Sequence, residues 1–224
     1  MNFHEDLIQG SQDWLDARCG VITASNVKKI LSPLTFKRVK EGSKYALSLA
    51  QERITKEVEP CFLSDDMLRG MYDEIIARQI YGNLNDLEVK EVGFITEEFD
   101  SVTIGYSPDG LVGEHGLIEI KSRKASYQIE TIVSNEMPVE YMLQIQTGLL
   151  VTKRRWCDFI SYSNGLPFFV KRIYPNLELH QLIVKSCIEI DAEVCDMIEK
   201  YERNSASLFV TEKNIFNDDQ EVVL

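Results

Sequence analysis

The chain of 224 residues contains only six prolines and two tryptophans, and none of its apolar runs is long enough to cross a membrane. A membrane-spanning helix needs about 18 or more consecutive apolar residues. The first residues also lack the basic and apolar segments of a secretory signal peptide. We therefore expect a cytoplasmic protein with no membrane partner.

Cysteine and histidine are also scarce, with five and three residues, and neither type is spaced as a set of metal ligands. The cysteines stand at positions 19, 61, 157, 187 and 195, so their number is odd and no C-x-x-C pair occurs. This pattern is typical of reduced thiols that pack in the core. It argues against a disulfide framework and against a structural zinc site.

Positive charge is in deficit, because 24 basic residues face 36 acidic ones and leave a net charge of −12. Such a balance disfavours nucleic acid as a partner, but the charge is unevenly distributed. Residues 28–56 carry eight basic residues against two acidic ones, residues 121–172 carry eight against four, and residues 176–224 carry four against eleven. The basic segments are suited to a DNA backbone, although a charge run also commonly serves only to solvate a helix face.

The most informative feature is a carboxylate in a tight turn, Asp109 of the segment SPDG at 107–110, followed by Glu119 and Lys121 in a strand-like run. Residues two apart in a strand share a face. Glu119 and Lys121 therefore lie together, while Ile118 and Ile120 point into the opposite, apolar layer.

The turn between the two strands decides whether Asp109 joins this face. A two-residue turn at 114–115 would send Asp109 to the other face. A three-residue loop of Gly113, Glu114 and His115, with Gly116 in a left-handed conformation, gives the correct parity. Direct opposition would then place the Cβ atoms of residues 109 and 119 roughly 4.5–5.5 Å apart.

This triplet is the minimal set of a metal-dependent nuclease. Mg²⁺ binds oxygen ligands, typically one or two carboxylates together with substrate phosphate, and it lowers the pKa of a bound water. Lys121 would orient the water or stabilise charge on the phosphorus. A polar hairpin with an exposed Glu/Lys pair is the alternative, and the spacing alone does not decide between the two.

Periodicity and turn signals predict the elements around the triplet. Helices are expected over 14–19, from the N-cap hydroxyls at 23–25 to about 31, and over 45–58, 65–81, 139–152 and 177–202. Strands are expected over 90–97, 102–106, 156–163 and 168–174. Gly148 costs roughly 1 kcal/mol within a helix, which indicates close packing against the sheet. The mixed order predicts an α/β fold with a central mixed β-sheet flanked by helices.

Three further motifs occur in order around the hairpin, namely QGSQDWLDARCGVITAS at 9–25, RGMYDE at 69–74 and YMLQIQ at 141–146. With them, residues 9 to about 163 closely resemble the lambda exonuclease and YqaJ group of viral recombinases, within the PD-(D/E)XK nuclease superfamily. The resemblance implies the PD-(D/E)XK (restriction-endonuclease-like) core for residues 1–175. Residues 176–224 are expected to form an acidic C-terminal helix and tail packed on the same domain.

The resemblance also implies roles for individual residues. Asp109, Glu119 and Lys121 would be catalytic, and the metal would be held by Glu74, Asp109, Glu119 and the main-chain carbonyl of Ile120. The 5′-terminal phosphate of the cut strand would be bound by Arg18, Ser25, Ser107 and Gln146. Simpler roles remain open: Glu74 as an exposed helical residue, Ser25 as a helix cap, Ser107 as a turn former. Gln144 and Gln146 cannot both face the site, because two helical positions differ by about 200°, and the resemblance points to Gln146.

The implied activity is that of a Mg²⁺-dependent 5′–3′ exonuclease, with Mn²⁺ as a substitute metal. It would act on the ends of linear double-stranded DNA, release mononucleotides and leave 3′ single-stranded tails for phage-type homologous recombination. The implied partners are a single-strand annealing protein and further copies of the chain in a homotrimeric ring. The apolar tail at 207–211 and 215–216 either docks on a neighbouring subunit or is a flexible terminus.

Two other functions stay open on the residues alone. A triplet that hydrolyses phosphodiesters does not fix where along DNA it acts, so an endonuclease of restriction or repair type is the alternative. From a different class, the net charge of −12 fits a non-enzymatic acidic DNA mimic. The chain also departs from the family pattern, since Arg69 precedes Gly70 where the lambda enzyme carries an aromatic residue, and the segment SRK at 122–124 replaces a Cys-Pro continuation.

Overall fold

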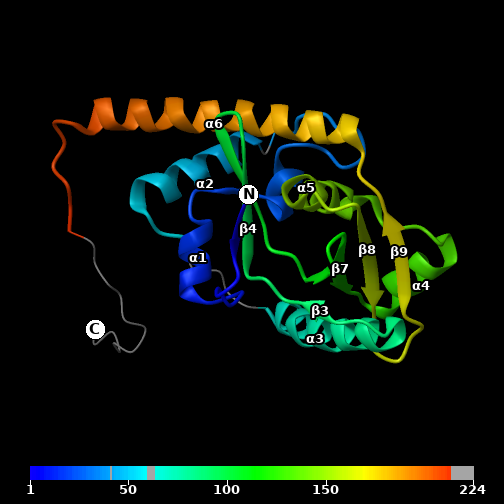
Figure 1. The fold of residues 1–224 in the computed structure, drawn as a ribbon. Helices are drawn as coiled ribbons and strands as arrows, with labels where there is room; N and C mark the ends of the chain where they lie inside the picture. The colour runs from blue at the N-terminus through cyan, green and yellow to red at the C-terminus, as the bar shows by residue number, and fades with distance from the viewer. Residues whose placement is uncertain (41, 60–63, 213–224) are drawn as a thin grey trace.

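The computed structural model describes residues 1–40, 42–59 and 64–212 (Figure 1). The helices are α1 (Gln12–Arg18), the 3₁₀ helix η1 (Ala24–Lys29), α2 (Gly42–Thr55), α3 (Asp65–Asn85), α4 (Ala125–Ser134), the 3₁₀ helix η2 (Val139–Tyr141), α5 (Met142–Thr152) and α6 (Leu177–Ser205). The strands are β1 (Asn2–His4), β2 (Ile22–Thr23), β3 (Val89–Lys90), β4 (Phe94–Phe99), β5 (Val102–Tyr106), β6 (Gly110–Val112), β7 (Gly116–Ser122), β8 (Trp156–Tyr162) and β9 (Phe169–Ile173).

The strands form two mixed sheets, with the orders β1-β4-β5-β2 and β3-β6-β7-β8-β9. In the smaller sheet β2 is parallel to β5, and in the larger sheet β7 is parallel to β8, while the other pairs are antiparallel. The chain crosses from β7 to β8 through α4 and α5. The predicted α/β class, a mixed sheet flanked by helices, is confirmed, with the difference that the strands divide between two sheets.

Helices cover both faces of the larger sheet. On one face Ala77 and Tyr81 of α3 pack against Ile118, Ile120 and Ile160. The main core, with α2, α5 and α6, lies on the other face. Figure 1 shows this layering, with α6 along the top, α3 along the bottom and β7, β8 and β9 between them. The prediction that residues 118 and 120 face an apolar layer is confirmed.

The hairpin of β6 and β7 has the expected loop but a different glycine in the strained position. Gly110 pairs with Ile118 and Val112 pairs with Gly116, so residues 113–115 form the three-residue loop. The left-handed residue is Gly113, with φ of 49°, and the prediction that Gly116 takes this conformation is wrong. Gly116 is required for another reason, because a Cβ there would lie 2.2 Å from the ring of Trp156.

Close packing joins α5 to β5, as the glycine in this helix predicts. A Cβ on Gly148 would lie 2.7 Å from the ring of Tyr106, which is itself buried. The absence of a side chain at 148 thus lets α5 approach the small sheet. This contact sets which face of α5 is turned toward the sheets.

Several predicted boundaries differ from the structure. Helix α3 continues past Gly82 to Asn85 and ends at Asp86 in a left-handed conformation. The segment after residue 23 is the 3₁₀ helix η1, and its N-cap residue Thr23 makes no side-chain capping bond. Helix α4 was not predicted at all. Within the described residues, no helix has the length and apolar character that crossing a membrane requires.

Helix α6 buries one face against the core through Leu179, Ile183, Cys187, Ile190 and Val194. After it, Leu208, Phe209 and Val210 are exposed. Residues 215–216, the second part of the predicted apolar tail, lie outside the described residues. The described cysteines are free thiols, and Cys61 likewise lies outside the described residues.

Candidate active site

Asp109 and Glu119 form a buried carboxylate pair at the end of the β6–β7 hairpin. The register that pairs Gly110 with Ile118 places residue 109 opposite residue 119. Oδ2 of Asp109 also accepts a hydrogen bond of 2.6 Å from the backbone N–H of Ile120. Two acidic side chains from opposite strands are thereby held against each other in the interior, as the hairpin pattern predicts.

Three donors from three elements converge on Glu119. Its Oε1 accepts hydrogen bonds from Nζ of Lys121 at 2.6 Å and from Nε2 of Gln144 at 2.5 Å. Its Oε2 accepts a bond of 2.8 Å from the hydroxyl of Tyr106. Burial and the charge of Glu119 raise the pKa of Tyr106 well above its ordinary value, so the phenol remains a donor. Strands β5 and β7 and helix α5 therefore meet at this carboxylate.

Lys121 is a permanently charged neighbour of the pair. Burial by itself would lower the pKa of Lys121, but the negative charges of Glu119 and Asp109 outweigh burial and raise this pKa. Its Nζ lies 5.5 Å from the ring centroid of Tyr141. The ammonium group is thus fixed between the carboxylates and an aromatic wall.

Glu74 reaches the same site from α3 and is positioned by an arginine. Arg78, one helical turn further on, donates to Oε1 of Glu74 at 2.5 Å and to the backbone carbonyl of Asp109 at 2.7 Å. Burial, with a contribution from the charge of Glu119, raises the pKa of Glu74 despite the ion pair with Arg78. The i,i+4 spacing of residues 74 and 78 is the signal in the sequence that indicates this pair.

The acidic groups fit a hard divalent cation. Burial and the charges of Glu119 and Glu74 raise the pKa of Asp109 well above its ordinary range, and a cation would relieve this repulsion. No three His, Cys, Asp or Glu side chains in the described part of the chain are close enough to hold a metal ion by themselves. Mg²⁺ is typically held by only one or two carboxylates, with waters and substrate phosphate completing its shell, and Asp109 with Glu119 meets that requirement.

The main chain of β7 offers one further oxygen. A residue in an extended strand directs its N–H and C=O to the same side. The N–H of Ile120 points to Asp109, so its carbonyl points toward that side of the strand as well. The residues that would hold the metal are therefore Asp109, Glu119 and the carbonyl of Ile120, with Glu74 nearby.

A guanidinium group lies beside this cluster, at the start of the connection to Asp109. Nη1 of Arg18 donates to Oγ of Ser107 at 3.0 Å, and Nε1 of Trp14 donates to the same oxygen at 3.0 Å. The guanidinium carbon lies 4.1 Å from the Trp14 ring centroid. Burial lowers the pKa of Arg18, yet an arginine stays protonated in proteins. Among the described residues no carboxylate forms an ion pair with Arg18, and such a group is suited to an anion.

Ser25 and Gln146, the other two predicted phosphate ligands, lie in different places. The parallel pairing of β2 and β5 brings residues 25 and 107 to the same end of the small sheet, but the only side-chain contact recorded for Ser25, within the described residues, is 3.4 Å to the Thr23 hydroxyl. Gln146 is buried elsewhere: it donates to the carbonyl of Tyr174 at 2.9 Å and accepts from the N–H of Asn176 at 2.8 Å. The prediction that Gln146 faces the site is wrong, and Gln144 takes that place.

Comparison with known proteins gives a consistent assignment. Residues 13–155 match the model of the YqaJ-like viral recombinase domain. The chain is similar to the crystal structure of an alkaline exonuclease (LHK-Exo) from Laribacter hongkongensis, with 34% identity and a TM-score of 0.80 over 89% of this chain and 100% of that one. The complex of LHK-Exo with dAMP gives 35% identity and a TM-score of 0.79 over the same shares of the two chains.

A more distant structure shares the fold alone. It is a phage related exonuclease from Haemophilus somnus 129PT, with 12% identity and a TM-score of 0.59 over 80% of this chain and 96% of that one. None of the curated proteins matches the chain significantly.

The strain in the carboxylate cluster predicts the effect of Asp109→Asn on stability. The amide oxygen keeps an acceptor for the N–H of Ile120, and the charge is removed. Because the folded state raises the pKa of Asp109, the carboxylate form costs stability, and this cost grows as the pH rises from about 4 through the raised pKa. We expect the variant, without metal, to unfold at a higher temperature than the unmodified chain at neutral pH, with no difference near pH 4, as measured by calorimetry.

Asp158→Asn is the matched control. Asp158 is also buried, but its two oxygens accept bonds of 2.7 and 2.8 Å from Arg172. Its replacement should lower the free energy of unfolding by roughly 1.5–3 kcal/mol, as expected for a lost charged hydrogen bond. A fall in stability of the same size for Asp109→Asn would contradict the proposed repulsion.

Proposed function

The chain belongs to the YqaJ-like viral recombinase family, and we propose that it is a Mg²⁺-dependent 5′–3′ exonuclease that degrades linear double-stranded DNA from its ends. Its family makes it a nuclease that acts on DNA. The observation that carries the finer proposal is the guanidinium of Arg18, which donates to Ser107, two residues before Asp109, and has no carboxylate partner among the described residues. An anion site next to the segment that carries a hydrolytic carboxylate is suited to recognition of a 5′-terminal phosphate.

The residues of the site support this chemistry. Bound Mg²⁺ would polarise a phosphoryl oxygen and lower the pKa of a water. Lys121 places a positive charge where negative charge develops on the phosphorus, and Glu119 holds it there at 2.6 Å. Tyr106 and Gln144 fix the orientation of Glu119, so the carboxylate does not have to reorganise during the reaction.

The proposed reaction regenerates its own substrate. Water attacks the phosphodiester after the terminal nucleotide, the bond from phosphorus to the 3′ oxygen breaks, and the leaving oxygen takes a proton. A mononucleotide is released, and the shortened strand carries a new 5′ phosphate that Arg18 can bind. The crystallised complex of LHK-Exo with dAMP supports a mononucleotide product. The remaining 3′ single-stranded tail would pass to a single-strand annealing protein, and Mn²⁺ would substitute for Mg²⁺.

Linear and covalently closed circular duplexes distinguish the candidate functions. We expect Mg²⁺-dependent release of mononucleotides from linear DNA and none from the closed circle, with Asp109→Asn as the inactive control. Efficient cutting of the circle would instead establish the restriction- or repair-type endonuclease. Absence of nucleotide release at every Mg²⁺ concentration would favour the acidic DNA mimic.

Arg18 predicts a preference for phosphorylated ends. A 5′-phosphorylated duplex should be digested faster than a 5′-hydroxyl duplex, and Arg18→Ala should reduce this preference by roughly 1.5–3 kcal/mol, the value of a charged hydrogen bond. Initial rates on the two substrates measure it. Arg203→Ala, which removes a charge from the far end of α6, should leave the preference unchanged, and an unchanged preference in Arg18→Ala would remove Arg18 from this role.

The proposal includes a homotrimer that encloses the DNA. The basic segments 28–56 and 121–172 would line the channel, and the acidic residues of α6 would face outward and disfavour DNA on the exterior. Sedimentation equilibrium of the purified protein should therefore give three times the mass of the chain. A monomer at micromolar concentration that digests long duplexes distributively would rule out this assembly.

A further inference from the structure

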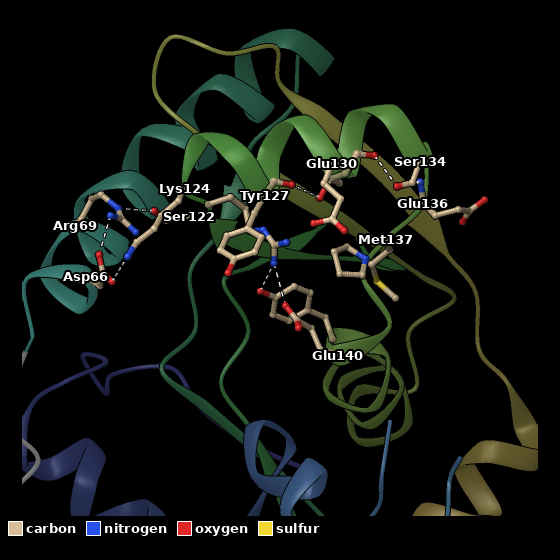
Figure 2. Close-up of a pocket in the computed structure, with 14 residues that line it drawn as sticks. Asp66, Arg69, Ser122, Lys124, Tyr127, Glu130, Ser134, Glu136, Met137 and Glu140 are labelled. Carbon is tan, nitrogen blue, oxygen red and sulfur yellow. Dashed lines mark hydrogen bonds and ion pairs between the residues drawn. The ribbon is translucent and has the colours of Figure 1, made fainter. Parts of the chain in front are cut away.

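The residues that follow Lys121 line a cavity of about 650 Å³ that the proposed chemistry does not use. Its walls come from the end of β7 and the residues after it, from α4, from the start of α3 and from the segment around η2 (Figure 2). Tyr141 lies between this cavity and the active site. Its ring is 5.5 Å from Nζ of Lys121, and its hydroxyl accepts a bond of 2.6 Å from Arg123.

Arg123 is the unusual group of the cavity. Its side chain is only 9% exposed, and its guanidinium carbon lies 5.1 Å from the Tyr127 ring and 5.5 Å from the Tyr141 ring. Nη1 binds Tyr141 and Glu140, but the buried Nε has no hydrogen-bond partner among the described residues. A buried donor without an acceptor is rare and costly, so this N–H points to an acceptor supplied by a ligand.

Two basic side chains of the cavity lie together. Arg69 and Lys124 lie at one end, where both pair with Asp66 at 2.8 and 3.0 Å. These are exposed pairs, which contribute little free energy, so a phosphate can take the place of the Asp66 carboxylate. Figure 2 shows these three residues together at one end, Glu136 at the other and Tyr127 between them.

The middle of the cavity is suited to a base. Tyr127 is 53% exposed and presents a free aromatic surface beside the guanidinium of Arg123. At the far end, the exposed carboxylate of Glu136 pairs with Lys171 at 3.3 Å and has a second oxygen that can accept a hydrogen bond from an amino group. A nucleotide would therefore lie with its phosphate toward Arg69 and Lys124 and its base on Tyr127.

We propose that this cavity is a nucleotide subsite for the cut strand, on the 3′ side of the scissile phosphate. The subsite rests on the proposed function, because it takes the Arg18 site as the position of the 5′ end. In Figure 1, α1 with Arg18 and α4 with Tyr127 lie on opposite sides of β7. A strand that ends at Arg18 and is cut at Glu119 and Lys121 thus continues into the cavity, where Tyr127 stacks on a base, Lys124 and Arg69 bind the next phosphate and Nε of Arg123 donates to the nucleotide.

The test combines a variant with a modified strand. The first probe is a 5′-phosphorylated single-stranded oligonucleotide, intact or with an abasic position as its second or third residue, and its affinity is measured by anisotropy in EDTA. The second is digestion of the corresponding duplexes with Mg²⁺. Tyr127→Ala removes the stacking surface, and Tyr201→Ala is the matched control, because Tyr201 is 52% exposed and lies on α6.

The expected pattern is non-additive. Loss of the stacked base should weaken binding to the unmodified chain about ten-fold or more. Tyr127→Ala should weaken binding of the intact strand by a similar factor, lose nothing more with the abasic strand and keep the preference for a 5′ phosphate. Arg123→Lys, which keeps the charge but has no Nε donor, should also weaken binding of the intact strand.

The outcomes separate this proposal from the proposed function. Two results would refute the subsite even when the chain digests linear DNA. One is that Tyr127→Ala binds the intact strand as tightly as Tyr201→Ala does. The other is that the abasic strand binds Tyr127→Ala more weakly than the intact strand by the same factor as it does for Tyr201→Ala. If the chain digests no DNA but its affinity depends on Tyr127 and on the base, the cavity is a nucleotide site, and both the exonuclease proposal and the position of the site relative to a scissile phosphate are refuted.

Discussion

The register of the β6–β7 hairpin is the constraint on which the site depends. With Gly110 opposite Ile118, Asp109 stands opposite Glu119 and beside the N–H of Ile120. A slip by one residue would turn every side chain of the strand to the other face, placing the carboxylate among the apolar residues under α3. Packing outside the turn supports the same register, because Gly116 lies against the ring of Trp156 at the start of β8, and the bulk of that ring leaves no room for a side chain at this position.

That register creates an electrostatic cost which the surroundings only partly offset. Lys121 and Arg78 each neutralise part of the charge on Glu119 and Glu74, while Tyr106 and Gln144 supply neutral donors. In the described part of the chain no cationic side chain is bonded to the carboxylate of Asp109, because Arg78 reaches only its backbone carbonyl, and Oδ2 accepts a hydrogen bond from a backbone N–H. Burial of such a group is costly unless a charge of opposite sign comes close. A divalent cation would offset the cost of burying the Asp109 carboxylate. The stability of the fold and the affinity for metal are therefore linked at this residue.

The hairpin could be predicted from the sequence because it is local: alternation assigns the faces, and loop length assigns the register. The errors concern packing between distant segments. The turn sequence alone predicts the left-handed conformation at Gly116. The true reason for a glycine there is its contact with Trp156, forty residues later in the chain, which the residues of the turn do not reveal. The choice of Gln146 over Gln144 has a different cause. Gly148 packs on the ring of Tyr106, and residues four apart share a helix face. The helix geometry therefore indicates Gln144, whereas the family resemblance indicates Gln146. Arg123 and Tyr127 could not be found, because the guanidinium and the aromatic rings around it meet only in the folded chain.

The local arrangement of charge also explains how a chain with a net charge of −12 can bind DNA. Exposed charges separated by more than about 8 Å are largely screened at physiological ionic strength, so the acidic residues along α6 contribute little at the carboxylate pair. A DNA strand near β7 would contact Arg18 on one side, Lys121 in the middle, and Lys124 with Arg69 on the other side. Arg18 is held by an aromatic ring and a hydroxyl, Lys124 by an exposed, replaceable carboxylate, and Lys121 by its buried ion pair with Glu119. A phosphate can therefore approach Arg18 and Lys124 without first breaking a buried ion pair. In the proposed function, the position of a few partly desolvated cations, and not the sum of charge over the chain, therefore determines where the DNA backbone binds.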